Sequence, residues 1–101
     1  MASRVRVPVG SLPEDQGTVV SLTSDEAAVF RRGDDVYAYR NACPHRGGPV
    51  GEGLVVDGVV TCPWHGNRFD IATGTCLSDP TLPPLTRIRW HRDGDELVVG
   101  A

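Results

Sequence analysis

The sequence predicts an all-β protein, an antiparallel β-sandwich or barrel, from three observations. Short runs alternate apolar and polar residues, which is the period of a strand with one buried face. Turn residues separate these runs at intervals of roughly eight to twelve positions. No window carries the apolar spacing of an amphipathic helix. Many short strands at even spacing are typical of small antiparallel sandwiches and barrels.

The first half of the chain is expected to contain four strands. Pro8 lies in the first of them, and proline is tolerated only at a sheet edge or a strand end. Gly33-Asp34-Asp35 separates the last two, which are therefore predicted to form a hairpin. The four strands are predicted at residues 4–9, 18–22, 27–31 and 36–39.

The second half is expected to contain five shorter strands around two hairpins. Asp57-Gly58 lies between two valine-rich runs, which is the strongest short-range hairpin signal. Residues 78–84 are rich in proline and are not expected to form regular structure. Phe30 and Trp90 are expected in the core. The five strands are predicted at residues 54–56, 59–61, 68–70, 86–92 and 96–99.

Length and composition indicate one soluble domain. The chain has 101 residues, 40% of them hydrophobic, and a formal net charge of −3, which gives no bulk electrostatic reason to bind nucleic acid. No signal-peptide core and no bilayer-spanning apolar run is present, so a cytoplasmic location is expected. The odd number of cysteines, three, argues against a disulfide framework.

Two short motifs each pair one cysteine with one histidine. The first is Cys43-Pro44-His45, and the second is Cys62-Pro63-Trp64-His65. Thiolates and imidazoles in such an arrangement predict a metal site. Structural zinc is one interpretation, but zinc knuckles usually pair two ligands of the same type. Mixing both types in each loop suits a centre with two metal ions better.

At these motifs the sequence resembles the Rieske iron–sulfur family. The likeness extends over nearly the whole chain and implies a single Rieske domain at residues 1–101. Its cluster-binding subdomain would cover about residues 41–85 and would be formed by the two loops. The matching segments are Cys43-Pro44-His45-Arg46-Gly47-Gly48, Cys62-Pro63-Trp64-His65-Gly66, Phe69-Asp70, Gly74 and the proline loop Pro83-Pro84-Leu85.

The resemblance implies a Rieske-type [2Fe-2S] cluster. Cys43 and Cys62 would bind one iron, and His45 and His65 would bind the other and face solvent. Two thiolates and two neutral imidazoles leave the oxidised cluster formally neutral, so it accepts an electron more readily than an all-cysteine cluster. No nucleotide-binding glycine motif and no mononuclear iron triad is found, so an electron carrier without catalytic residues is expected, not an enzyme.

The loops favour the low-potential branch of the resembled family. High-potential members carry a disulfide whose cysteines would stand at Gly48 and Trp64. They also place serine and tyrosine hydroxyls, which donate to the cluster, where this chain has Asn67 and Phe69. A phenylalanine cannot donate a hydrogen bond. We therefore expect a potential toward the low end of the family range.

The resemblance then implies a small ferredoxin of an aromatic-ring dioxygenase system. Such a monomer takes electrons from a flavin-dependent NAD(P)H reductase and delivers them to a terminal oxygenase, with both partners docking transiently near His45 and His65. One alternative is a Rieske-type small subunit of a nitrite-reductase-like enzyme, and a more distant one is a structural zinc module. Iron and acid-labile sulfide analysis would separate the zinc module from the others.

Two remaining residues of metal-binding type are expected to be structural. Cys76 lies outside both motifs and is predicted to be a buried, inert thiol. His91 has no cysteine nearby and is predicted to be an exposed surface histidine.

Overall fold

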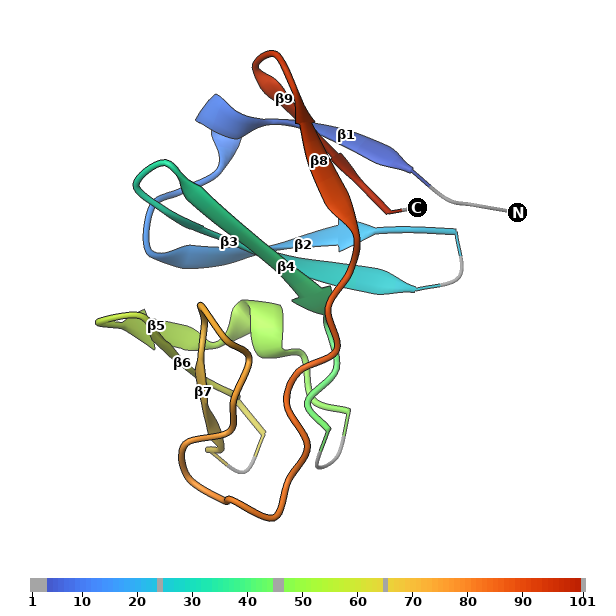
Figure 1. The fold of residues 1–101 in the computed structure, drawn as a ribbon. Helices are drawn as coiled ribbons and strands as arrows, with labels where there is room; N and C mark the ends of the chain where they lie inside the picture. Colours follow the sequence, from blue (N-terminus) through green and yellow to red (C-terminus); the bar gives the residue numbers. More distant parts are fainter. Residues whose placement is uncertain (1–3, 24, 45–46, 65, 101) are drawn as a thin grey trace.

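The computed structural model describes residues 4–23, 25–44, 47–64 and 66–100, which form three antiparallel sheets of three strands. We call them the terminal, central and loop sheets from top to bottom of Figure 1. The terminal sheet has the order β1 (Val5–Pro8), β9 (Glu96–Val99), β8 (Trp90–Asp93). The central sheet has the order β2 (Gln16–Ser21), β3 (Glu26–Arg32), β4 (Asp35–Arg40). The loop sheet has the order β5 (Leu54–Val56), β6 (Val59–Thr61), β7 (Arg68–Asp70).

The predicted all-β antiparallel class is confirmed. The sheets stay separate and form no closed barrel within the described residues. Two short 3-10 turns, η1 (Val9–Ser11) and η2 (Val50–Glu52), are the helical elements of that part of the chain. No helix there is long and apolar enough to cross a membrane.

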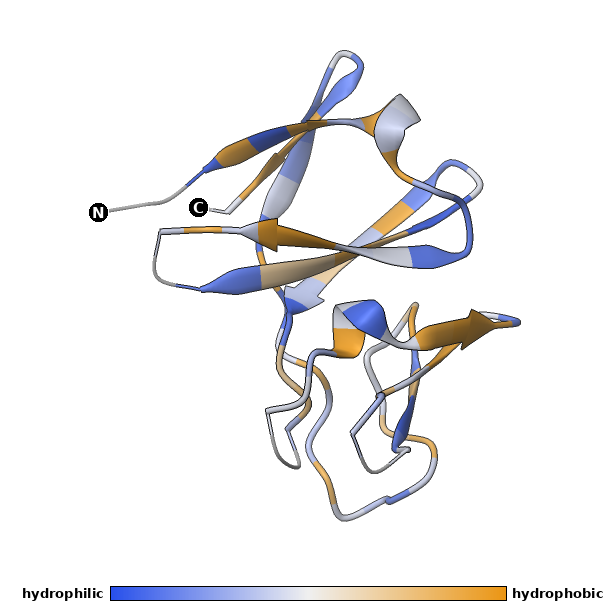
Figure 2. Ribbon diagram, turned by 180° about the vertical axis from the view of Figure 1, so that it is seen from behind, coloured by the Kyte–Doolittle hydropathy of each residue, from blue (hydrophilic) through white to orange (hydrophobic). Residues whose placement is uncertain are grey.

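Strand β3 separates two hydrophobic cores. Ala27 and Val29 pack with residues of the terminal sheet, whereas Ala28 and Phe30 pack with the cysteine loops and the loop sheet. Successive side chains of a strand point to opposite faces, so four consecutive apolar residues serve both cores. Along β1, by contrast, apolar and polar positions alternate, as Figure 2 shows, because only one face is buried.

The Asp57-Gly58 hairpin forms as predicted. Both residues have positive φ, 50° and 78°, as a two-residue type I′ turn requires. The Gly58 carbonyl accepts the backbone N–H of Ile71 at 2.9 Å, which ties the turn to the end of β7. Strand β6 then ends at Thr61 and leads directly into Cys62.

The strand predicted at residues 86–92 starts later than expected. Strand β8 begins at Trp90, because residues 86–88 instead run alongside β4, where the Ile88 N–H donates to the Ala38 carbonyl at 3.0 Å. The expectation of a buried Trp90 is wrong: the side chain is 38% exposed, on a strand at the edge of its sheet. Phe30 is fully buried, as predicted.

Tyr39 joins the central sheet to the segments around the loop sheet. Its ring is fully buried, and its hydroxyl donates to the Ile71 carbonyl at 2.5 Å. The guanidinium of Arg87 lies 5.7 Å from the ring centroid, within the range of a cation–π contact. Burial is the main cause that raises the pKa of Tyr39, while the charge of Arg87 acts in the opposite direction.

Tyr39→Phe is expected to lower the free energy of unfolding at pH 7 by about 1–3 kcal/mol, because the Ile71 carbonyl loses its donor. Because the folded pKa of Tyr39 lies above the ordinary tyrosine value of 10.0, the unfolded chain releases this proton first. The contribution of Tyr39 to the free energy of unfolding is therefore fully present below pH 10. It is lost as the pH rises toward the folded pKa of Tyr39. Urea unfolding at pH 7 and above pH 10 measures both effects.

Tyr37→Phe is the matched control, since Tyr37 is only partly buried on the same strand. We expect a change of no more than about 0.5 kcal/mol at pH 7 and an alkaline slope like that of the wild type. Equal effects of the two substitutions would contradict the role given to Tyr39.

Candidate metal centre

Two loops with the same closure hold the predicted ligands. The first runs from Cys43 to Gly48 after β4, and the second from Cys62 to Asn67 after β6. In each loop the cysteine N–H donates to the carbonyl five residues later, Gly48 in the first and Asn67 in the second, both at 2.8 Å. We call these segments the ligand loops. The closures hold Cys62 directly after β6 and Cys43 three residues after β4.

A glycine of positive φ turns the chain inside each ligand loop. Gly47 has φ 72° and Gly66 has φ 73°, a region that L side chains rarely adopt. The Gly47 N–H donates to the Cys43 carbonyl at 2.7 Å and so tightens the first loop further. The matched turns explain why both motifs carry glycine at these places.

The two cysteines of the motifs meet in the interior. Cys43 is 3% exposed and Cys62 is 1% exposed, and both are free thiols in hydrogen-bond contact with each other. Burial raises the pKa of the Cys62 thiol, and the neighbouring Cys43 raises it further. The backbone N–H of Trp64, which donates to the Cys62 sulfur, acts in the opposite direction.

This pair fits a metal centre. Two adjacent buried thiolates would repel each other without a cation between them, so the pair requires either protons or a metal. The Trp64 N–H already provides a donor to sulfur, as a thiolate ligand prefers. The thiol half of the predicted ligand set is therefore assembled by the fold.

The ligand loops touch each other at Gly48. A Cβ added there would lie 2.8 Å from the Cys62 sulfur and 2.9 Å from the Trp64 Cβ. Positions 48 and 64, which the resemblance relates to a disulfide in high-potential relatives, therefore face each other across the loops. In this chain, glycine leaves the space that the Trp64 side chain and the Cys62 sulfur occupy.

Ser78 fixes the end of the second loop. Its hydroxyl accepts the Arg68 N–H at 3.0 Å and donates to the Asn67 side-chain oxygen at 3.1 Å. Cys76, buried as predicted, lies with its sulfur 3.7 Å from the same hydroxyl. Sequence reasoning missed Ser78, because its proline-rich segment has no local pattern that pairs it with Arg68.

Asn41 fixes the start of the first loop, and sequence reasoning did not identify this residue either. Its side chain is 8% exposed, its oxygen accepts the Gly51 N–H at 2.7 Å, and its amide nitrogen donates to Glu26 at 3.2 Å. An asparagine two residues after a predicted strand resembles an ordinary turn residue in sequence. Its contact with η2 depends on tertiary packing.

The loops present a partly apolar surface to solvent. Trp64 is 52% exposed, and Gly47, Pro83 and Pro84 are exposed as well. Leu85 is 3% exposed and anchors the proline loop in the core beside the cysteines. The predicted ligands His45 and His65, together with Arg46, lie outside the described residues.

Comparisons with known proteins agree with this geometry. A family model described as "Rieske [2Fe-2S] domain" matches residues 4–89. Ferredoxin CarAc of Metapseudomonas resinovorans is 40% identical over 74 residues, which are 72% of this chain and 69% of that protein. The ferredoxin of carbazole 1,9a-dioxygenase from Nocardioides aromaticivorans superposes with a TM-score of 0.84 at 31% identity over 96% of both chains.

Two further structures are similar in fold. A complex of reduced oxygenase and oxidised ferredoxin in carbazole 1,9a-dioxygenase contains a chain that matches with a TM-score of 0.83 and 28% identity, over 94% of this chain and 99% of that one. A protein from Mycobacterium tuberculosis assigned as an NADH-dependent nitrite reductase small subunit matches with a TM-score of 0.81 and 23% identity, over 100% of this chain and 96% of that one. At that identity the second likeness shows the fold alone.

Proposed function

Because this chain belongs to the Rieske [2Fe-2S] domain family, we propose that it is the ferredoxin component of an oxygenase system, carrying one electron from a reductase to a terminal oxygenase. It contains a Rieske-type [2Fe-2S] cluster, as its family and its ferredoxin relatives do. When bound, that cluster takes up and releases a single electron. The chain is an electron carrier and not a catalyst.

We assign the cluster ligands as Cys43, His45, Cys62 and His65. One observation supports this most directly: two loops with the same closure bring Cys43 and Cys62 together as buried free thiols. Each histidine follows its cysteine within two or three positions in the same loop. The residues at about 41–85 would then form the cluster-binding subdomain within a single domain at 1–101.

The surroundings of the second loop support a low reduction potential. Phe69 is fully buried and has no hydroxyl to donate to the cluster. Fewer donors to the cluster stabilise its reduced, more negative form less.

We expect a midpoint potential well below about +100 mV, in the lower part of the family range of about −150 to +300 mV. Protein-film voltammetry measures it directly. A midpoint above that limit would contradict the assignment to the low-potential branch.

Partner docking is proposed at the exposed edge of the ligand loops, near His45 and His65. Trp64 and the proline loop provide a small, partly apolar patch there, which suits a transient electron-transfer encounter. A related ferredoxin has been solved in complex with its terminal oxygenase. By analogy we propose a flavoprotein reductase and an oxygenase as successive partners of a monomeric, cytoplasmic carrier.

Reconstitution tests this function. The protein is added to a flavin-dependent reductase, NAD(P)H and the terminal oxygenase of a carbazole dioxygenase system, and product formation is followed by chromatography. We expect product only when all components are present. If the protein instead copurifies from its native source in a fixed ratio with a larger polypeptide, the nitrite-reductase-like subunit becomes the better reading.

A further inference from the structure

The outer face of the terminal sheet has a regular arrangement of charge. The register β1-β9-β8 places Arg6, Val98 and His91 in one row across the three strands. Extended by two residues, the same register gives a row of Arg4, Gly100 and Arg89, and the Gly100 N–H donates to the Arg89 carbonyl at 2.8 Å. Rows two residues apart share a face, so these two rows lie on the same side.

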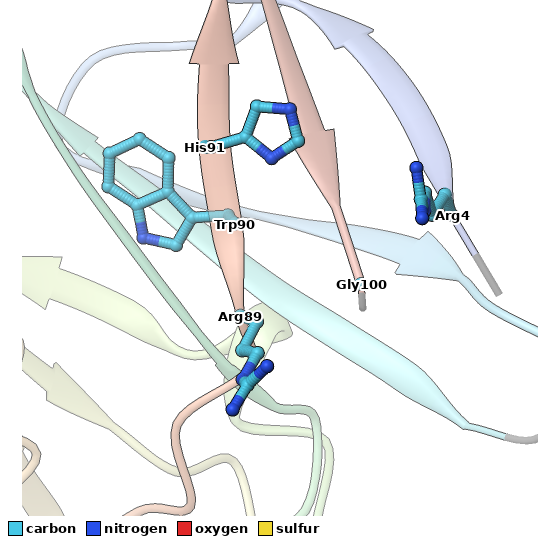
Figure 3. A pocket seen from close by; sticks show the side chains of 5 residues that line it. All are labelled: Arg4, Arg89, Trp90, His91 and Gly100. Atoms are coloured by element: carbon cyan, nitrogen blue, oxygen red, sulfur yellow. The ribbon is translucent and has the colours of Figure 1, made fainter. Parts of the chain in front are cut away.

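The row of Arg4, Gly100 and Arg89 leaves a hollow between its two arginines. Gly100, with φ 99°, has no side chain to fill the space between Arg4 and Arg89. Figure 3 shows Gly100 between the two, with His91 and Trp90 on opposite sides of β8. The pocket has a volume of about 340 Å³ and is lined by Arg4, Arg89, Trp90, His91 and Gly100. Across two strand spacings the arginine Cα atoms stand about 10 Å apart, close enough for both side chains to reach one ligand.

Within residues 4–23, 25–44, 47–64 and 66–100, no carboxylate pairs with the two arginines of this pocket. The acidic residues of the same face, Asp93 and Glu96, lie two rows from Arg4 and Arg89, beyond the row of Arg6, and both are paired with Arg6, at 3.0 and 3.4 Å. Arg4 and Arg89 form no ion pair with any described residue. A protein of net charge −3 thus places two guanidinium groups, without an ion pair to the described part of the chain, on either side of one small hollow.

We propose that this pocket binds a phosphate group, either as inorganic phosphate or as the phosphate of a nucleotide. A guanidinium donates two parallel hydrogen bonds to an oxyanion, and two arginines that converge on one dianion add their charges. The volume of the pocket lies at the small end of ligand sites, which suits a compact group. The terminal sheet stands at the opposite end of the molecule from the ligand loops, so a bound phosphate leaves the docking edge free (Figure 1).

The test is a titration of the ¹⁵N-labelled holoprotein with sodium phosphate, followed by backbone amide NMR signals at constant ionic strength kept with sodium chloride. We expect saturable shifts at Gly100 and His91. Arg4→Gln and Arg89→Gln should each weaken phosphate binding by about tenfold or more, because each removes a charge-assisted hydrogen bond. A second titration with adenosine monophosphate separates the two sources: tighter binding than inorganic phosphate, dependent on the same arginines, assigns a nucleotide.

Arg92→Gln is the matched control. Arg92 lies on β8, opposite Leu97, in a row that faces the other side of the sheet. Its guanidinium donates to the Gly94 carbonyl at 3.1 Å. This variant loses the same charge and should bind phosphate within about twofold of the wild type. Shifts that never saturate, or equal weakening by Arg92→Gln and Arg89→Gln, would overturn the proposal, because either would indicate nonspecific attraction.

Discussion

Cys62→Ser is expected to yield a colourless protein that holds almost no iron or acid-labile sulfide. The serine hydroxyl does not ionise near neutral pH and is a poor ligand for iron, whereas the buried Cys62 sulfur lies in contact with Cys43 and accepts the Trp64 N–H. Visible absorption and the EPR signal of the dithionite-reduced protein measure the loss. Circular dichroism of the same samples shows whether the strands still form.

Cys76→Ser provides the control within the same core. Cys76 is also a free and buried thiol, 7% exposed, and packs in the same hydrophobic cluster as Cys62. Its substitution should leave iron, sulfide and the EPR signal unchanged. A Cys62→Ser protein that keeps a full cluster would refute the ligand assignment, and a colourless wild-type protein containing one zinc per chain would favour the zinc module.

Gly48→Ala is expected to have the second largest effect. The added methyl would lie within 3.0 Å of three atoms, the Cys62 sulfur and the Trp64 Cβ and Cγ, so the ligand loops would have to move apart. Overpacking of this kind destabilises a protein by about 1–3 kcal/mol. Because the strain acts on the sulfur of a proposed ligand, we expect a lower iron content per chain and faster loss of the cluster on heating.

Gly10→Ala tests whether this effect is local. An added Cβ at Gly10 would have no atom within 4 Å, so the substitution should be neutral or slightly stabilising. Iron per chain and the half-time of cluster loss are compared between the two variants. Wild-type values for Gly48→Ala would show that the ligand loops have more room than the structure indicates.

Local patterns in the sequence were sufficient for the strands. Alternation with period two and the Asp57-Gly58 dipeptide depend only on neighbouring residues, and the strands they predicted are present. The exception is the segment 86–92, which alternates like one strand: residues 86–88 bond to β4, whereas Arg89 and β8 join the terminal sheet. Periodicity identifies a strand-like segment but not the partner along each part of it.

The sequence by itself determined the family, the all-β class and the candidate ligands, because ligand types and their spacing are written in two short contiguous motifs. Only the tertiary structure decided which distant groups meet. It brought Cys43 to Cys62, Ser78 to Asn67, and Arg4 to the hollow beside Arg89. The physical reason is that the register and packing of strands far apart in the chain are set by burial of whole faces, which no local pattern encodes.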